Sequence, residues 1–98
     1  MAKDSFIIKE NSWLAKIAAK KLRSSAVAMV IGNTIHLHNT TAGDFLQDHR
    51  WVKHELCHIR QYKQHGTTGF IVKYLWESLK KGYYNNRFEV EARSAENE

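Results

Sequence analysis

Residues 49–66 read HRWVKHELCHIRQYKQHG, and the predicted fold is built outward from this stretch. Asp48 lies in front of it and can cap a helix, and Gly66 is a residue at which helices commonly end. The sequence therefore predicts a helix from about His49 to His65, and the side chains on that helix carry the chemistry.

The middle of this helix contains His54, Glu55 and His58, which form the pattern HExxH. Residues four apart lie on one helix face, so both imidazoles can bind one tetrahedral Zn²⁺ at about 2.0 to 2.1 Å. Glu55 follows the first histidine by one position, which places it beside the metal as a general base for a water molecule. The sequence thus predicts one Zn²⁺ per chain, bound by His54 and His58, with Glu55 as the catalytic residue.

A zinc site of this kind needs a third protein ligand and an open fourth position. A metzincin would have glycine and histidine at the positions of Gln61 and Gln64, which excludes that class. We expect a carboxylate from the C-terminal helix, either Glu89 or Glu91, because residues two apart on a helix cannot bind the same ion. Glu89 has a rival role, since Asn86 followed three residues later by glutamate is the pattern of a capping box.

The segments HELCHIRQYKQHG and GYYNNRFEVEAR resemble the gluzincins, and among them the short, minigluzincin-like metallopeptidases of bacteria and phages. The resemblance covers roughly residues 26–95. In gluzincins, HExxH is joined by a glutamate on a later helix, often followed three residues on by alanine, which matches Glu89 and Ala92. The resemblance implies a zincin-like fold, peptidase activity and Glu89 as third ligand. It also implies that the strand at 34–38 borders the cleft and pairs with an extended substrate.

The rest of the chain predicts a single α+β domain over residues 1–98, with its core at about 12–95. Four further elements are expected: a helix at 12–23, a β-hairpin at 26–38, and helices at about 67–82 and 87–95. The segment NTTAGD at 39–44 is turn-like, and a frayed acidic tail is expected at the C-terminus.

Several other side chains are expected to pack, because they recur with helical period or lie off the histidine face. They are Trp13, Leu14, Ile17, Ala18 and Leu22 in the first helix, Trp51 and Cys57 in the second, and Phe70, Ile71, Tyr74, Leu75, Trp76 and Leu79 in the third. His36 and His38 are expected at the surface of the hairpin. An oxyanion would need a hydrogen-bond donor, for which Tyr83, Tyr84, His65 and Arg93 are the candidates, and packing between helices is the rival role of the two tyrosines.

The charge and composition narrow the choice of partners. The net charge of +5 could attract nucleic acid, but lysine and arginine are scattered and lack interleaved aromatic residues, which disfavours this partner. Arg50, Lys53, Arg60 and Lys63 give the HExxH helix a basic flank that is typical of any solvated helix. No apolar run approaches the roughly 18 residues of a membrane span, and the N-terminus has no signal-peptide pattern. With Cys57 as the single cysteine, we expect a cytoplasmic protein.

The function that the sequence favours is zinc-dependent hydrolysis of peptide or amide bonds in a peptide or protein substrate. An alternative is a zinc-stabilised binding or regulatory domain with little activity, because 98 residues leave little room for a walled cleft. A third is a basic nucleic-acid-binding module, whose affinity would fall steeply with salt and would not respond to chelators. The sequence does not indicate an oligomeric state.

Overall fold

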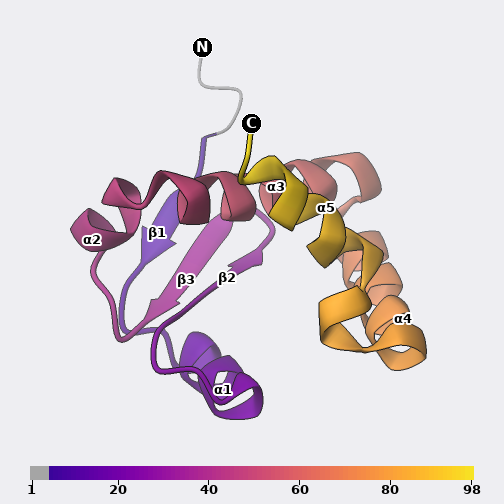
Figure 1. Ribbon diagram of the computed structural model, residues 1–98, viewed down its shortest axis with the longest axis horizontal. Helices are drawn as coiled ribbons and strands as arrows, with labels where there is room; N and C mark the ends of the chain where they lie inside the picture. The colour runs from indigo at the N-terminus through magenta and orange to yellow at the C-terminus, as the bar shows by residue number, and fades with distance from the viewer. Residues whose placement is uncertain (1–4) are drawn as a thin grey trace.

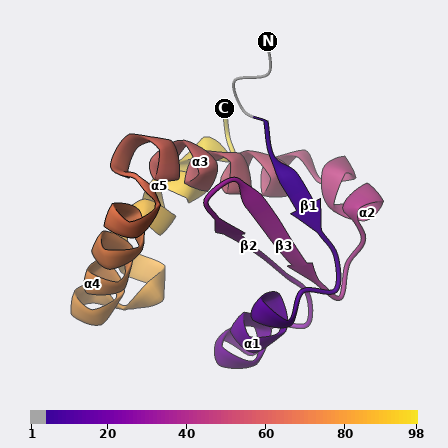
Figure 2. The same ribbon diagram turned by 180° about the vertical axis from the view of Figure 1, so that it is seen from behind.

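The computed structural model describes residues 5–98, which form a helix, a three-stranded sheet and a second layer of helices. The elements in chain order are β1 (Ile7–Lys9), α1 (Trp13–Leu22), β2 (Val27–Ile31), β3 (Thr34–His38), α2 (Ala42–Gln47), α3 (His49–His65), α4 (Thr67–Asn85) and α5 (Arg87–Ala95). Helix α3 crosses one side of the sheet, and α4 and α5 lie beyond β2 (Figures 1 and 2). The predicted α+β class is confirmed; the first four residues of the predicted domain lie outside the described residues.

The sheet has the order β1-β3-β2, so β3 is its central strand. Strands β2 and β3 pair antiparallel, as the predicted hairpin requires, and Gly32 takes a positive φ of 65° in the turn that joins them. Strand β1 pairs parallel with β3 and was not predicted, because three residues are too few to show a period of two. Within residues 5–98, β2 has no strand neighbour on its outer side.

The two faces of the sheet pack against different helices. Val27 and Met29 of β2 pack against α1, where Ala15 and Ala19 are buried, and small side chains let that helix approach closely. Of the residues predicted to pack in this helix, Ala18 does so, but the prediction was wrong for Trp13, which is 65% exposed, and for Ile17 and Leu22, which are also exposed. Alternate residues of the sheet face α3 and belong to the main core, which comprises Val30, Ile35, Leu37, Phe45, Ile59, Tyr62, Phe70 and Phe88.

Helix α3 begins and ends as predicted. The Asp48 carboxylate accepts a hydrogen bond of 3.2 Å from the Trp51 backbone N–H, which caps the first turn. The segment 39–44, predicted as a turn, contains the start of the six-residue helix α2, which Thr41 caps. Six residues are too few for a helical period to appear in the sequence. Trp51 packs edge-on against Phe45, with ring centroids 5.2 Å apart, as a packing residue should.

Helix α4 is longer than predicted and packs through a narrower face. The residue Gly82, expected to end it, interrupts it with a φ of 82°, and a final turn continues to Asn85. Phe70 is buried and Ile71 and Tyr74 pack against the core, but the expected packing of Leu75, Trp76 and Leu79 was wrong, since all three are exposed. The buried face continues from Phe70 and Tyr74 to Glu77, which accepts from the backbone N–H of Arg87 at the start of α5.

No helix among residues 5–98 combines the length and apolar character needed to cross a membrane.

Candidate metal centre

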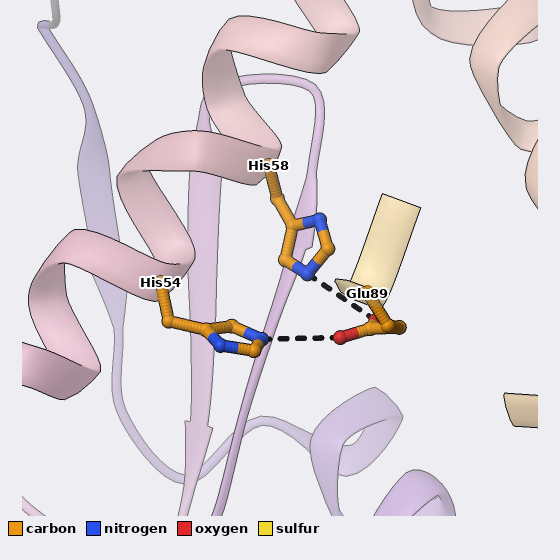
Figure 3. A group of neighbouring side chains, drawn as sticks. All are labelled: His54, His58 and Glu89. Atoms are coloured by element: carbon orange, nitrogen blue, oxygen red, sulfur yellow. Dashed lines mark hydrogen bonds and ion pairs between the residues drawn. The ribbon is translucent and has the colours of Figure 1, made fainter. Parts of the chain in front are cut away.

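Two histidines of α3 and one glutamate of α5 converge on a single point (Figure 3). His54 Nε2 lies 3.1 Å from Glu89 Oε1, and His58 Nε2 lies 3.2 Å from Glu89 Oε2. One donor atom from each side chain lies within 4.8 Å of the others. Ligands of a tetrahedral zinc ion, each about 2.0 to 2.1 Å from the metal, lie roughly 3.3 Å apart. This donor set and its spacing therefore fit Zn²⁺.

The structure brings Glu89, and not Glu91, to the two histidines. The Glu91 carboxylate accepts a hydrogen bond of 2.6 Å from Gln61 Nε2 instead. Asn86 does cap α5, since its Oδ1 accepts from the Phe88 backbone N–H at 2.8 Å. The Glu89 carboxylate faces the imidazoles while Asn86 alone provides the cap, so the two roles weighed for Glu89 are separated in space.

Small residues set the position of α5 against α3. Ala92 and Ala95 are buried together with Cys57, which lies between the two histidines on α3. Cys57 is a packing residue, as predicted. Because no large side chain separates the two helices here, the first turn of α5 lies near the histidines, and the short Glu89 side chain reaches them.

Each histidine has a second partner at its other ring nitrogen. His54 Nδ1 lies 2.8 Å from Glu96 Oε2, and His58 Nδ1 lies 2.8 Å from Gln61 Oε1. An acceptor at Nδ1 holds the proton on that atom and leaves Nε2 to bind a metal, an arrangement typical of metal-binding histidines.

Sequence reasoning missed both of these partners. Gln61 lies three residues after His58 on the same helix face, and this spacing is a signal that could have identified it. Glu96 lies in the tail that was expected to fray, which was wrong. The tail contacts α3 through Glu96, which pairs with Arg50 at 3.3 Å, and through the backbone carbonyl of Glu98, which accepts from Lys53. Two members of the predicted basic flank therefore contact the chain's own C-terminal residues.

Tyr74 is a further residue of the centre that was expected only to pack. Its hydroxyl donates a hydrogen bond of 2.5 Å to Glu89 Oε2, which orients the carboxylate. Of the four oxyanion candidates, Tyr83 borders the same cavity as His54 and Glu55. Tyr84 lies against Arg93, with the guanidinium 3.9 Å from its ring, and His65 lies beside Lys73.

Glu55 lies buried beside the two histidines. Its side chain is buried, and burial raises the pKa of its carboxyl to about 7, against the opposing effect of His58 and His54. The pKa of Glu89 is lowered, because hydrogen bonds from His54 and His58 outweigh the effect of its burial. The two glutamates thus differ in the way that a general base and a permanently charged ligand should differ.

The centre opens onto two cavities, of about 470 and 540 Å³, that share His54, Glu55 and Tyr83 in their linings. Edge strand β2 borders the cavities and contributes Val27 and Ala28 to both. The expectation that the strand at 34–38 borders the cleft was wrong, because β3 is hydrogen-bonded to a strand on each side. On β3, His36 and His38 are half-buried on one face, and His36 Nδ1 lies 2.8 Å from Ser12 Oγ.

The family model of the eCIS core domain matches residues 12–66. The chain belongs to the eCIS core domain family. The match extends from Ser12, which caps α1, to Gly66, which follows α3, and so includes His54, Glu55 and His58. Glu89 lies outside the matched residues. Its place in the candidate metal centre of this eCIS core domain therefore rests on its distances to His54 and His58 alone. Searches of curated proteins and of solved structures gave no match, and the gluzincin resemblance stays a prediction.

Replacing Glu96 with alanine is expected to weaken zinc binding by roughly 10- to 100-fold, because His54 loses the acceptor that fixes its ring. The matched control is Arg50→Ala, which removes the exposed ion pair with Glu96 but leaves the bond to His54 in place. Competition with a chromogenic zinc chelator measures both affinities. Equal affinities in the two variants would show that Glu96 does not position His54.

Zinc binding is expected to strengthen as the pH rises from 6 to 8. Burial opposes protonation of His54, but the carboxylates of Glu89, Glu55 and Glu96 together raise the pKa of its imidazole to about 9. Protonated His54 stabilises the zinc-free fold fully below its ordinary pKa of about 6.5, and this contribution is lost as pH rises toward 9. Zinc binds only the neutral imidazole, so the stabilisation that zinc gives to the fold increases as the pH rises.

Thermal melts with and without zinc at pH 6, 7 and 8 test this expectation. The increase in Tm that zinc causes should grow with pH, and an increase that shrinks would contradict the proposed role of His54.

Proposed function

We propose that this eCIS core domain is a zinc-dependent hydrolase that cleaves peptide bonds in a peptide or protein substrate. One observation carries the proposal: two imidazoles and a carboxylate meet at the spacing of a tetrahedral zinc site, and a buried glutamate lies beside them. A structural zinc site has no need of that glutamate, and structural sites usually have four protein ligands. Here the described residues supply three, which leaves a position open toward the two cavities.

In the proposed reaction, His54, His58 and Glu89 hold the metal, which when bound lowers the pKa of a water molecule to about 7 and polarises the substrate carbonyl. Glu55 would take a proton from the water molecule as the water oxygen bonds to the substrate carbonyl carbon, and would pass that proton to the amine nitrogen as the C–N bond breaks. The raised pKa of Glu55 suits both transfers, because the carboxyl can accept and release a proton near neutral pH. Tyr74 keeps Glu89 oriented through the hydrogen bond to Oε2.

Edge strand β2 is the proposed binding strand for the substrate backbone. Its outer backbone N–H and C=O groups have no strand partner within residues 5–98, and the strand borders both cavities. An extended peptide paired with β2 would pass in front of His54 and Glu55. Tyr83 borders the same space and is the proposed donor to the oxyanion.

The test is cleavage of a fluorescently labelled, denatured casein by the zinc-reconstituted chain. Activity should be lost on addition of 1,10-phenanthroline and restored by excess zinc, because without the ion no activated water molecule is available to Glu55. One bound zinc per chain without cleavage would contradict the proposal and favour a zinc-stabilised binding domain. The buried, single Cys57 fits the further proposal that the protein works in the reducing cytoplasm.

A further inference from the structure

The two cavities that meet at the metal centre differ in chemistry. The larger, of about 540 Å³, is lined by His58 and Glu89 and by many apolar side chains, among them Met29, Phe70, Ile71 and Leu75. The smaller, of about 470 Å³, is lined by Ser24, Asp48, Arg50 and Glu96 together with apolar residues such as Ala26 and Trp51. Both include His54 and Glu55, so a bond cleaved at the centre would lie next to an apolar space and a more polar one.

We infer that the substrate is an extended polypeptide with a large apolar side chain on one side of the cleaved bond and a polar residue on the other. This inference rests on the proposed hydrolase function and names its substrate class. The 540 Å³ cavity falls within the range of about 300 to 1,000 Å³ found for ligand pockets, which is ample for a leucine or phenylalanine side chain. A polar side chain placed among Met29, Phe70, Ile71 and Leu75 would lose water without gaining hydrogen bonds from them.

Two exposed apolar residues that do not pack in the core lie in the wall of the apolar cavity. Leu75 is 62% exposed on α4, and Leu22 is exposed on α1, yet both line this cavity. Figures 1 and 2 show that α1 and α4 lie apart, with the β2 edge between them. Apolar surface left open at a cavity mouth commonly marks a binding site for an apolar group.

An extended peptide is the occupant that would use both the unpaired edge of β2 and the apolar cavity. Its backbone can pair with the outer edge of β2, and alternate side chains then point to opposite sides of the new strand. One such side chain would enter the apolar cavity beside Phe70 and Ile71. The neighbour across the cleaved bond would meet Arg50, Asp48 and Glu96.

The experiment begins by mapping the cleavage sites that the zinc-loaded chain produces in denatured casein. Matched synthetic peptides then carry phenylalanine, alanine or aspartate at the position beside the cleaved bond. We expect kcat/KM to favour phenylalanine by roughly 10- to 200-fold over alanine, the range found for hydrophobic pockets that discriminate by size. Cleavage without an apolar preference would overturn the inference while leaving the hydrolase function intact.

A variant pair tests whether this cavity is responsible. Leu75→Asp should lower kcat/KM for the phenylalanine peptide at least about tenfold, because it places a charge in the apolar lining. Leu79→Asp makes the same change one turn along α4, at a residue 79% exposed and outside the lining, and should leave kcat/KM unchanged. Equal effects of both variants would overturn the assignment.

A binding measurement separates this inference from the proposed function. Zinc-loaded Glu55→Gln should bind the fluorescein-labelled phenylalanine peptide at least about tenfold more tightly than the aspartate peptide in fluorescence polarisation. If the wild type cleaves nothing and this preference persists, the hydrolase function fails and the apolar site stands. If neither peptide is preferred, the apolar site fails.

Discussion

Replacing Glu89 with glutamine is expected to weaken zinc binding by more than the roughly 10- to 100-fold that loss of an outer partner costs, because Glu89 is proposed to bind the ion directly. Glu91→Gln is expected to leave the affinity unchanged, since the Glu91 carboxylate accepts from Gln61 and does not face the histidines. Elemental analysis after reconstitution, followed by titration against a chromogenic chelator, measures the difference.

The two variants form a matched pair, because each removes one negative charge from α5 and keeps the shape of the side chain. Circular dichroism of the zinc-free proteins controls for loss of fold. Removing Glu89 also deprives half-buried His54 and buried His58 of a carboxylate, so some loss of stability is expected without zinc. Zinc retained by Glu89→Gln and lost by Glu91→Gln would contradict the geometry of the centre.

The histidine pair could be predicted from the sequence because its geometry is local. Helix α3 has a cap at Asp48, and residues four apart on any helix lie on one face, so His54 and His58 needed no knowledge of the rest of the fold. The choice between Glu89 and Glu91 depends on how α5 is rotated. That rotation is set by the packing of Ala92 and Ala95 near Cys57, a long-range contact that no short pattern encodes.

The strand that borders the cleft was predicted wrongly for a comparable reason. The sequence predicts a hairpin of two strands but does not indicate which of them lies at the edge of the sheet beside the cleft. Strand β1, only three residues long, pairs with β3 and makes it central, which leaves β2 at the edge. Segments this short have no periodicity, so the decisive contact is visible only in the folded chain.

The errors in the predicted core have a structural reason. A helical period shows that one face of a helix is apolar, but not whether that face meets the core or an open cavity. In α1 the tight contact with the sheet uses Ala15 and Ala19, and in α4 the buried face continues through Glu77. Leu22 and Leu75 were therefore free to line the cavity beside the metal centre.

Replacing Glu55 with glutamine is expected to lower the rate of peptide cleavage by at least about 10²- to 10⁴-fold, the usual contribution of a general base. Zinc content should stay near one ion per chain, because Glu55 does not belong to the donor set. Glutamine nearly matches the shape of glutamate, so the buried position beside His54 should tolerate it. Paired measurements of zinc content and of kcat/KM on one peptide test both halves of this expectation.

The two readouts together decide which hypothesis for the zinc site is right. Glu55 has a raised pKa because it is buried, and a fold with a purely structural site would gain nothing from keeping an ionisable group there. If Glu55→Gln binds zinc, loses activity and melts at a temperature equal to or above the wild type, Glu55 is retained for chemistry at the cost of stability. If activity survives the substitution, another group supplies the base, and the proton transfers assigned to Glu55 are wrong.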